Sequence, residues 1–98
     1  MLNITKKPED KTLTLALEGR LDTNTAPQLE GEIKGAEGVS TLILDFEELD
    51  YISSAGLRVL LSAQKKMKTQ GAMKIVHVGE AIMDIFEVTG FVDILTIE

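Results

Sequence analysis

Several residue types are scarce or absent in this chain, and each absence excludes a class of protein. There is no cysteine among the 98 residues, which excludes disulfide scaffolds, thiolate zinc sites, iron–sulfur clusters and cysteine nucleophiles. The single histidine, His77, excludes a metal site built from several histidines. Aromatic residues make up only 4% and tryptophan is absent, so a platform for stacking nucleic-acid bases is not expected.

Basic residues are also in the minority, with 10 Lys and Arg against 16 Asp and Glu and a net charge of −6. This balance disfavours direct nucleic-acid binding, which depends on neutralising phosphates. No apolar run approaches the roughly 20 residues of a membrane-spanning helix, and the charged N-terminus lacks the apolar stretch of a signal peptide. We therefore expect a cytoplasmic monomer without membrane insertion, forming a single domain over residues 1–98.

The spacing of apolar residues predicts a series of short strands and helices. Alternation on either side of a turn at residues 8–11 predicts a hairpin, with its second strand able to continue to Leu21. Helical spacing predicts three helices, at residues 25–36, 55–70 and 80–89. Short apolar runs predict three further strands, at residues 40–46, 73–78 and 93–97. At the start of the first helix, Thr25 and Gln28 have the spacing of a capping box.

The order of these elements predicts an α/β fold with a mixed sheet. From the second strand onward strands and helices alternate, which implies right-handed crossovers between parallel strands. The opening hairpin adds an antiparallel edge, giving about five strands flanked by three to four helices. Because residues 40–46 are almost continuously apolar, we expect that strand to be covered on both faces.

In such sheets, sites form beyond the carboxyl ends of the parallel strands. Residues 19–25, 49–57 and 79–80 are predicted to converge there. Ser53 and Ser54 stand where the second predicted helix begins. Serine is a favoured N-cap; alternatively, a helix N-terminus stabilises an anion, so that a serine there could carry a covalent phosphate or help to bind a free one.

Other chemistries lack their motifs. There is no GxxxxGK[ST] or GxGxxG loop for a nucleotide and no Gly-x-Ser-x-Gly nucleophile elbow, so no catalytic residue and no cofactor are expected. His77 lies in a predicted strand and is interpreted as a structural histidine. Residues 45–50 hold four carboxylates, which predicts a solvated loop; without a cation-loop pattern, no metal site is expected.

Three blocks of sequence resemble one known family. Gly19-Arg20-Leu21-Asp22-Thr23 with Thr25-Ala26-Pro27, Leu42-Ile43-Leu44-Asp45-Phe46, and Tyr51-Ile52-Ser53-Ser54-Ala55-Gly56-Leu57-Arg58-Val59-Leu60-Leu61 together resemble the STAS domains. More narrowly, essentially the whole chain is similar to bacterial anti-sigma factor antagonists. The two blocks that begin at Gly19 and Tyr51 are fairly specific together, and either alone is weak.

The resemblance implies a partner switch rather than an enzyme. An unphosphorylated antagonist of this family binds an anti-sigma factor that is also a serine kinase, which frees a sigma factor. The kinase uses ATP to phosphorylate one Ser or Thr at the start of the second helix, the antagonist is released, and a PP2C-type phosphatase resets it. The alternative is a constitutive STAS scaffold, as a subunit of a lipid-trafficking transporter or a stress-sensing assembly. Nucleotide binding, reported for some relatives, has no phosphate loop here to support it.

The family pattern Asp-Ser-Ser/Thr-Gly-Leu, aligned on Gly56, assigns the modified serine to Ser54, with Ser53 as the second candidate. Ser53 replaces the pattern's aspartate, which leaves recognition by the kinase open, and Arg58 replaces a small residue of some members. A phosphate on Ser54 would add about −1.5 to −2 charges near Asp50, and near Asp22 if the loops converge. The residues expected to contact the partner are Asp22, Thr23, Asn24, Ser53, Ser54, Gly56 and Arg58.

Overall fold

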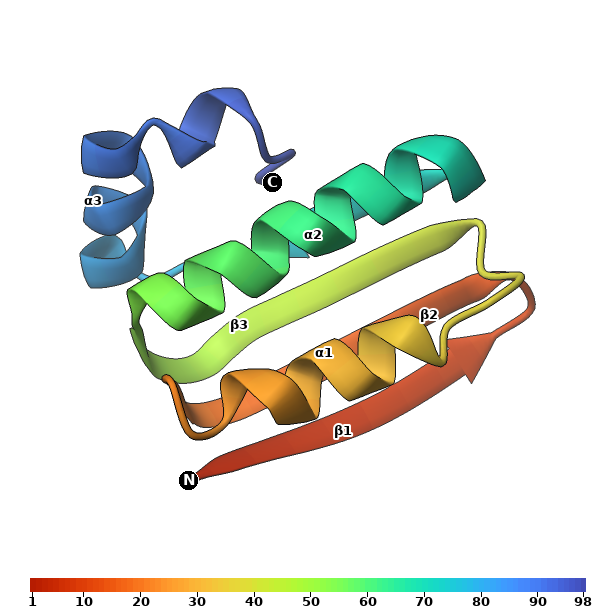
Figure 1. The fold of residues 1–98 in the computed structure, drawn as a ribbon, viewed down its shortest axis with the longest axis horizontal. Helices are drawn as coiled ribbons and strands as arrows, with labels where there is room; N and C mark the ends of the chain where they lie inside the picture. Colours follow the sequence, from red (N-terminus) through yellow and green to blue (C-terminus); the bar gives the residue numbers. More distant parts are fainter.

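Four strands form one mixed sheet in the order β1-β2-β3-β4 in the computed structural model, which describes all 98 residues (Figure 1). The strands are β1 (Leu2–Glu9), β2 (Thr12–Leu21), β3 (Thr41–Ile52) and β4 (Ala72–Val76). The helices are α1 (Ala26–Lys34), α2 (Ser54–Gln70) and α3 (Glu80–Thr89), followed by a 3-10 turn, η1 (Phe91–Asp93). β1 pairs antiparallel to β2, and the other two pairings are parallel. The predicted hairpin, alternation and mixed sheet are confirmed.

The buried strand side chains lie on one face of the sheet, beneath the helices. As far as Leu17 in β2 and Phe46 in β3, every second residue is buried, and Leu15 and Leu44 are fully buried. These side chains join the inner faces of the helices in one cluster of 23 buried residues, and Figure 1 shows α1 and α2 side by side over the sheet. Ile43 and Asp45, on the opposite face, are only half-buried. The prediction that residues 40–46 are covered on both faces is therefore wrong.

The predicted fifth strand at residues 93–97 is not formed, so the sheet has four strands. Gly90 adopts a left-handed conformation with φ 81°, and the chain then turns tightly through η1. The Leu95 amide donates to the Phe91 carbonyl at 2.8 Å, which a strand would not allow. The segment meets the sheet in a single parallel bridge between Ile97 and Ile75, made by the Ile75 amide donating to the Thr96 carbonyl and the Glu98 amide donating to the Ile75 carbonyl. The apolar pattern of this segment reflects burial of Leu95 rather than strand pairing.

β3 is longer than predicted and includes the acidic run. Its pairing with β2 continues to Leu21↔Ile52 through register shifts after Ala16 and Gly19. The prediction of a solvated loop at residues 45–50 is therefore wrong, because bulges let the strand continue while its carboxylates face outward. As a result β2 and β3 end at the same edge of the sheet, where α1 and α2 begin.

Side chains of α2 hold α1 and the segment after it in place. The Lys66 ammonium donates to the carbonyls of Ile33 and Lys34, at 3.1 and 3.3 Å, at the end of α1. The Gln70 amide donates to the carbonyls of Ala36 and Val39, at 2.8 and 2.6 Å. These contacts fix the two helices relative to one another. None of the helices has both the length and the apolar character needed to cross a membrane.

Candidate functional site

Two of the three segments predicted to converge do meet, at the shared end of β2 and β3. The Ser53 amide donates to the Leu21 carbonyl at 2.9 Å, which joins the start of α2 to the end of β2. The third segment, Gly79–Glu80, takes no part in these contacts. It follows β4, which pairs only with Thr41–Asp45 and so ends beside Asp45, well before the end of β3.

The two serines at the start of α2 differ in exposure. Ser53 is the N-cap by backbone position: its φ and ψ are extended, and its carbonyl accepts from the Leu57 amide at 3.0 Å. Its side chain makes no capping hydrogen bond, and its Oγ atom is buried without a partner. Ser54 is the first helical residue and is exposed. Of the two hydroxyl groups, only that of Ser54 is open to another protein.

The Asp22 carboxylate organises the loop that faces this helix. Its Oδ1 atom accepts from the amides of Asn24 and Thr25 at 3.0 and 3.1 Å, and the Thr25 hydroxyl accepts from the Asp22 amide at 2.8 Å. Partial burial alone would raise the pKa of Asp22, but the hydrogen bonds from Thr25 and Asn24 outweigh it and lower the pKa below its usual value. The carboxylate is therefore ionised at neutral pH.

This arrangement replaces the predicted capping box at the start of α1. Thr25 makes no side-chain capping hydrogen bond; its hydroxyl donates instead to the Arg20 carbonyl at 2.8 Å. The Gln28 side chain, which the capping box would return to Thr25, donates to the Leu2 carbonyl at 3.1 Å. The capping-box prediction is wrong because both side chains find partners outside the helix.

Arg20 and Tyr51 form a pair at the rim of the site that the sequence did not single out. The parallel register places them directly opposite one another, and the Arg20 Cζ atom lies 4.2 Å from the centre of the Tyr51 ring. The Arg20 Nε atom is also 3.8 Å from Asp22 Oδ2. Such an exposed cation–π contact is worth about 0.5–1 kcal/mol. It holds an aromatic ring and a cation beside the Asp22 loop.

A groove of about 280 Å³ runs between the first turns of α1 and α2. Thr23 and Arg58 are among the residues that line it. Arg58 is exposed, has no ion-pair partner, and lies one helical turn after Ser54. Of the residues predicted to contact a partner, Thr23, Asn24, Ser54 and Arg58 are exposed, and Thr23 and Arg58 line the same groove.

Gly56 is buried, and its lack of a side chain lets α2 pack closely against the ends of β2 and β3. A Cβ atom there would lie 2.8 Å from Cγ1 of Ile52 and 2.9 Å from Cγ of Leu21. Only glycine lets the first turn of α2 approach the ends of β2 and β3 this closely. Gly56 thus sets how closely the turn that carries Ser54 and Arg58 approaches the sheet.

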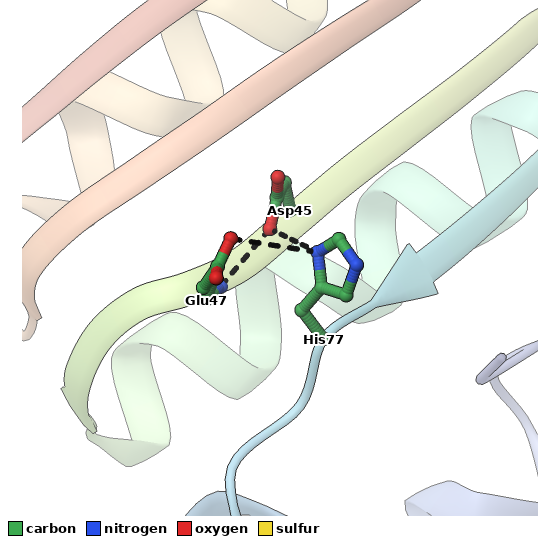
Figure 2. A group of neighbouring side chains, drawn as sticks. All are labelled: Asp45, Glu47 and His77. Carbon is green, nitrogen blue, oxygen red and sulfur yellow. Dashed lines mark hydrogen bonds and ion pairs between the residues drawn. The ribbon is translucent and has the colours of Figure 1, made fainter.

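A second polar cluster joins His77, after β4, to Asp45 and Glu47 of β3 (Figure 2). His77 Nδ1 lies 2.9 Å from Asp45 Oδ1 and 4.0 Å from Glu47 Oε2. The hydrogen bond to Asp45 and the Asp45 charge raise the pKa of His77. For Asp45, partial burial raises the pKa, but hydrogen bonds from the Glu47 amide and His77 lower it overall. No sequence motif predicts this cluster, because it is the parallel pairing of β3 with β4 that brings the residues together.

Comparison with known proteins places the chain in a family. The profile of the STAS domain matches residues 3–98. The chain is 33% identical over 99 residues to BtrV of Bordetella bronchiseptica, and the match covers 98% of this chain and 85% of BtrV. BtrV itself is named only provisionally as an anti-sigma factor antagonist. It is 29% identical over 98 residues to the anti-sigma-B factor antagonist of Bacillus subtilis, covering 98% and 90%. The chain belongs to the STAS domain family, and these relatives are named anti-sigma factor antagonists.

The fold agrees with this assignment. SpoIIAA, an anti-sigma factor antagonist solved in its unphosphorylated form, superposes with a TM-score of 0.77 at 19% identity, covering 100% of this chain and 87% of SpoIIAA. Bacillus SpoIIAA in its phosphorylated form superposes with a TM-score of 0.76 at 20% identity, covering 100% of this chain and 91% of SpoIIAA. At these identities the similarity shows the fold alone.

Proposed function

We propose that this protein is an anti-sigma factor antagonist controlled by phosphorylation of Ser54. In this proposal the unphosphorylated chain binds an anti-sigma factor that is also a serine kinase, and the sigma factor is released for transcription. The kinase transfers the γ-phosphoryl group of ATP to Ser54 Oγ, which loses its proton, and ADP leaves. A PP2C-type phosphatase then hydrolyses the phosphate ester with water. The chain acts as binding partner and substrate, and supplies no catalytic group.

The observation that carries the proposal is the exposed Ser54 hydroxyl at the first turn of α2. It is reachable, whereas the Ser53 Oγ atom is buried, so accessibility supports Ser54 over Ser53 as the acceptor. The exposed neighbours on the same surface, Thr23 and Arg58, are available to contact the kinase. The named functions of the relatives support the class of partner.

Phosphorylation at this position can change affinity without refolding the domain. The positive end of the α2 dipole stabilises a phosphate on Ser54, so the helix keeps its start. The phosphate brings about −1.5 to −2 charges to a surface where Asp22 is already ionised. A partner that packs against neutral Ser54 then has to bury an unpaired charge. A hundredfold loss of affinity requires only about 2.7 kcal/mol.

The proposal is tested by measuring how Ser54 variants bind the anti-sigma kinase encoded in the same genome. We expect Ser54→Ala to bind like the unphosphorylated protein and to resist release by ATP. Ser54→Asp should lose at least tenfold in affinity. Ser40→Asp provides the matched control, because Ser40 is exposed at the opposite end of β3 and the charge change is the same.

The outcomes separate the proposal from its alternative. Equal binding by Ser54→Ala and Ser54→Asp to a partner that binds the wild type would contradict the switch and favour a constitutive scaffold. Release by ATP that survives Ser54→Ala but is lost in Ser53→Ala would move the acceptor to Ser53. Weakening by Ser40→Asp as large as that by Ser54→Asp would show a general charge effect.

A further inference from the structure

We propose that Asp45, Glu47 and His77 form a binding site for a divalent transition-metal ion, with Zn²⁺ as the representative case. The site would use one imidazole nitrogen from the residue that follows β4 by one position and two carboxylate oxygens from the middle of the neighbouring parallel strand β3. It lies apart from Ser54, and it does not depend on the function proposed above.

The donor atoms lie close enough together for one ion to bridge them after small side-chain movements. Zinc binds nitrogen and oxygen ligands at about 2.0–2.2 Å, which places neighbouring ligand atoms about 3–3.5 Å apart. The observed separations from His77 Nδ1, 2.9 Å to Asp45 and 4.0 Å to Glu47, lie on either side of this range. The second is too long for a hydrogen bond, yet small side-chain rotations would bring all three atoms to one ion.

The three side chains direct their donor atoms toward one common position. The donor atoms all lie within 4.8 Å of one another, and Figure 2 shows Nδ1 of His77 turned toward both carboxylates. The Asp45 Oδ1 atom also accepts from the Glu47 backbone amide at 3.0 Å, which orients the Asp45 carboxylate. A hollow of about 170 Å³, lined by the two carboxylate residues and by Lys7 among others but not by His77, leaves room beside the carboxylates for water ligands of an exposed ion.

Charge and ligand type point to the same class of ion. Two carboxylates with one neutral imidazole carry two negative charges, in a chain whose net charge is already −6. The Lys7 ammonium acts on Asp45 and offsets part of this charge, and the remainder attracts a cation. An imidazole nitrogen favours zinc and its neighbours over magnesium or calcium, which prefer oxygen ligands alone. On binding, the metal ion would take the place of the proton that joins His77 Nδ1 to Asp45 Oδ1.

Calorimetric titration of the untagged protein with Zn²⁺ at pH 8 tests this proposal. The pH is chosen because only neutral imidazole binds a metal ion. We expect saturable binding of one ion per chain, and a change in the nitrogen signals of the single imidazole by NMR. Removing one ligand should lower the affinity by about tenfold or more. Magnesium and calcium should bind far more weakly.

Two variants remove ligands and one serves as the matched control. His77 has a positive φ of 57°, which asparagine adopts more readily than most other side-chain-bearing residues, so His77→Asn is the substitution chosen, and thermal unfolding without metal checks that it folds. Glu47→Gln and Glu48→Gln change the same charge at adjacent exposed positions of β3, but only the first removes a donor. Loss of zinc binding in His77→Asn and Glu47→Gln, with Glu48→Gln unchanged, is the expected result.

Several results would overturn the proposal. Absence of saturable zinc binding in the wild type would show that the cluster is a histidine–carboxylate ion pair and nothing more. Unchanged affinity in His77→Asn would place the ion elsewhere, such as at the N-terminal amine. Equal weakening by Glu47→Gln and Glu48→Gln, or magnesium binding as tight as zinc binding, would indicate a diffuse acidic surface.

Discussion

Gly56→Ala is expected to destabilise the domain, although alanine is the better helix former. The added methyl group would meet Cγ1 of Ile52 at 2.8 Å and Cγ and Cδ2 of Leu21 at 2.9 and 3.0 Å. Both side chains are buried, with Leu21 at 0% and Ile52 at 3% exposure. The atoms nearest the methyl include inner ones, so neither side chain can simply swing its tip away.

The magnitude follows from two opposing contributions. Replacing glycine by alanine inside a helix stabilises it by up to about 1 kcal/mol, whereas overpacking a core costs about 1–3 kcal/mol. The steric cost should dominate, because the methyl has contacts on two strands at once. We expect a net loss of about 1–2 kcal/mol, and for a domain of this size each kcal/mol lowers Tm by about 4–8 °C.

Gly31→Ala is the matched control for this substitution. Gly31 lies inside α1, and a Cβ atom there would have no neighbour within 4 Å, so only the helix-propensity gain remains. The free energy of unfolding, measured by urea denaturation, should therefore fall for Gly56→Ala and rise by about 0.5–1 kcal/mol for Gly31→Ala. If both substitutions stabilised the domain, the close approach of α2 to the strand ends would be refuted.

Three further predictions concern charged side chains. Because hydrogen bonds lower the pKa of Asp22, its contribution to stability is present above the unfolded pKa of about 3.9 and is lost as pH falls through the lower folded value. As the pH is lowered below 4, the urea concentration at the unfolding midpoint should therefore fall more for the wild type than for Asp22→Asn. The same pH dependence of the midpoint in both proteins would contradict this. Lys66→Met should cost about 1 kcal/mol, because its ammonium caps α1, with Lys65→Met, on the exposed side of α2, nearly neutral in the same assay. In protein phosphorylated on Ser54, Arg58→Gln should raise the second pKa of the phosphate in a ³¹P NMR titration, because residues four apart on a helix are neighbours; an unchanged titration would show that the guanidinium does not reach the phosphate.

Local patterns were sufficient for most of the fold. The alternation in Leu13, Leu15 and Leu17 predicted β2, and the helical spacing in residues 55–70 predicted α2 to within one residue at its start. Long-range pairing accounts for the errors. β3 continues through an acidic run only because β2 runs beside it with two register shifts. Residues 93–97 have a strand-like composition, but Gly90 turns the chain before they can pair along β4.

The candidate site was predictable in its residues but not in their roles. Sequence motifs located Asp22 and Ser54, yet they did not show that Asp22 braces its own loop or that Gly56 is buried. The exposure difference between Ser53 and Ser54 depends on how α2 sits on the strand ends, which no motif encodes. The His77 cluster depends wholly on the β3–β4 register, so only the folded chain reveals it.

The proposed function depends above all on phosphorylation of Ser54. Intact mass followed by phosphosite mapping should be carried out on the protein isolated from its native host, in growing and in stressed cells. We expect a single phosphate on Ser54 whose occupancy changes between the two conditions. No phosphate in either condition, with the anti-sigma kinase expressed, would refute the phosphorylation switch and leave a constitutive binding domain.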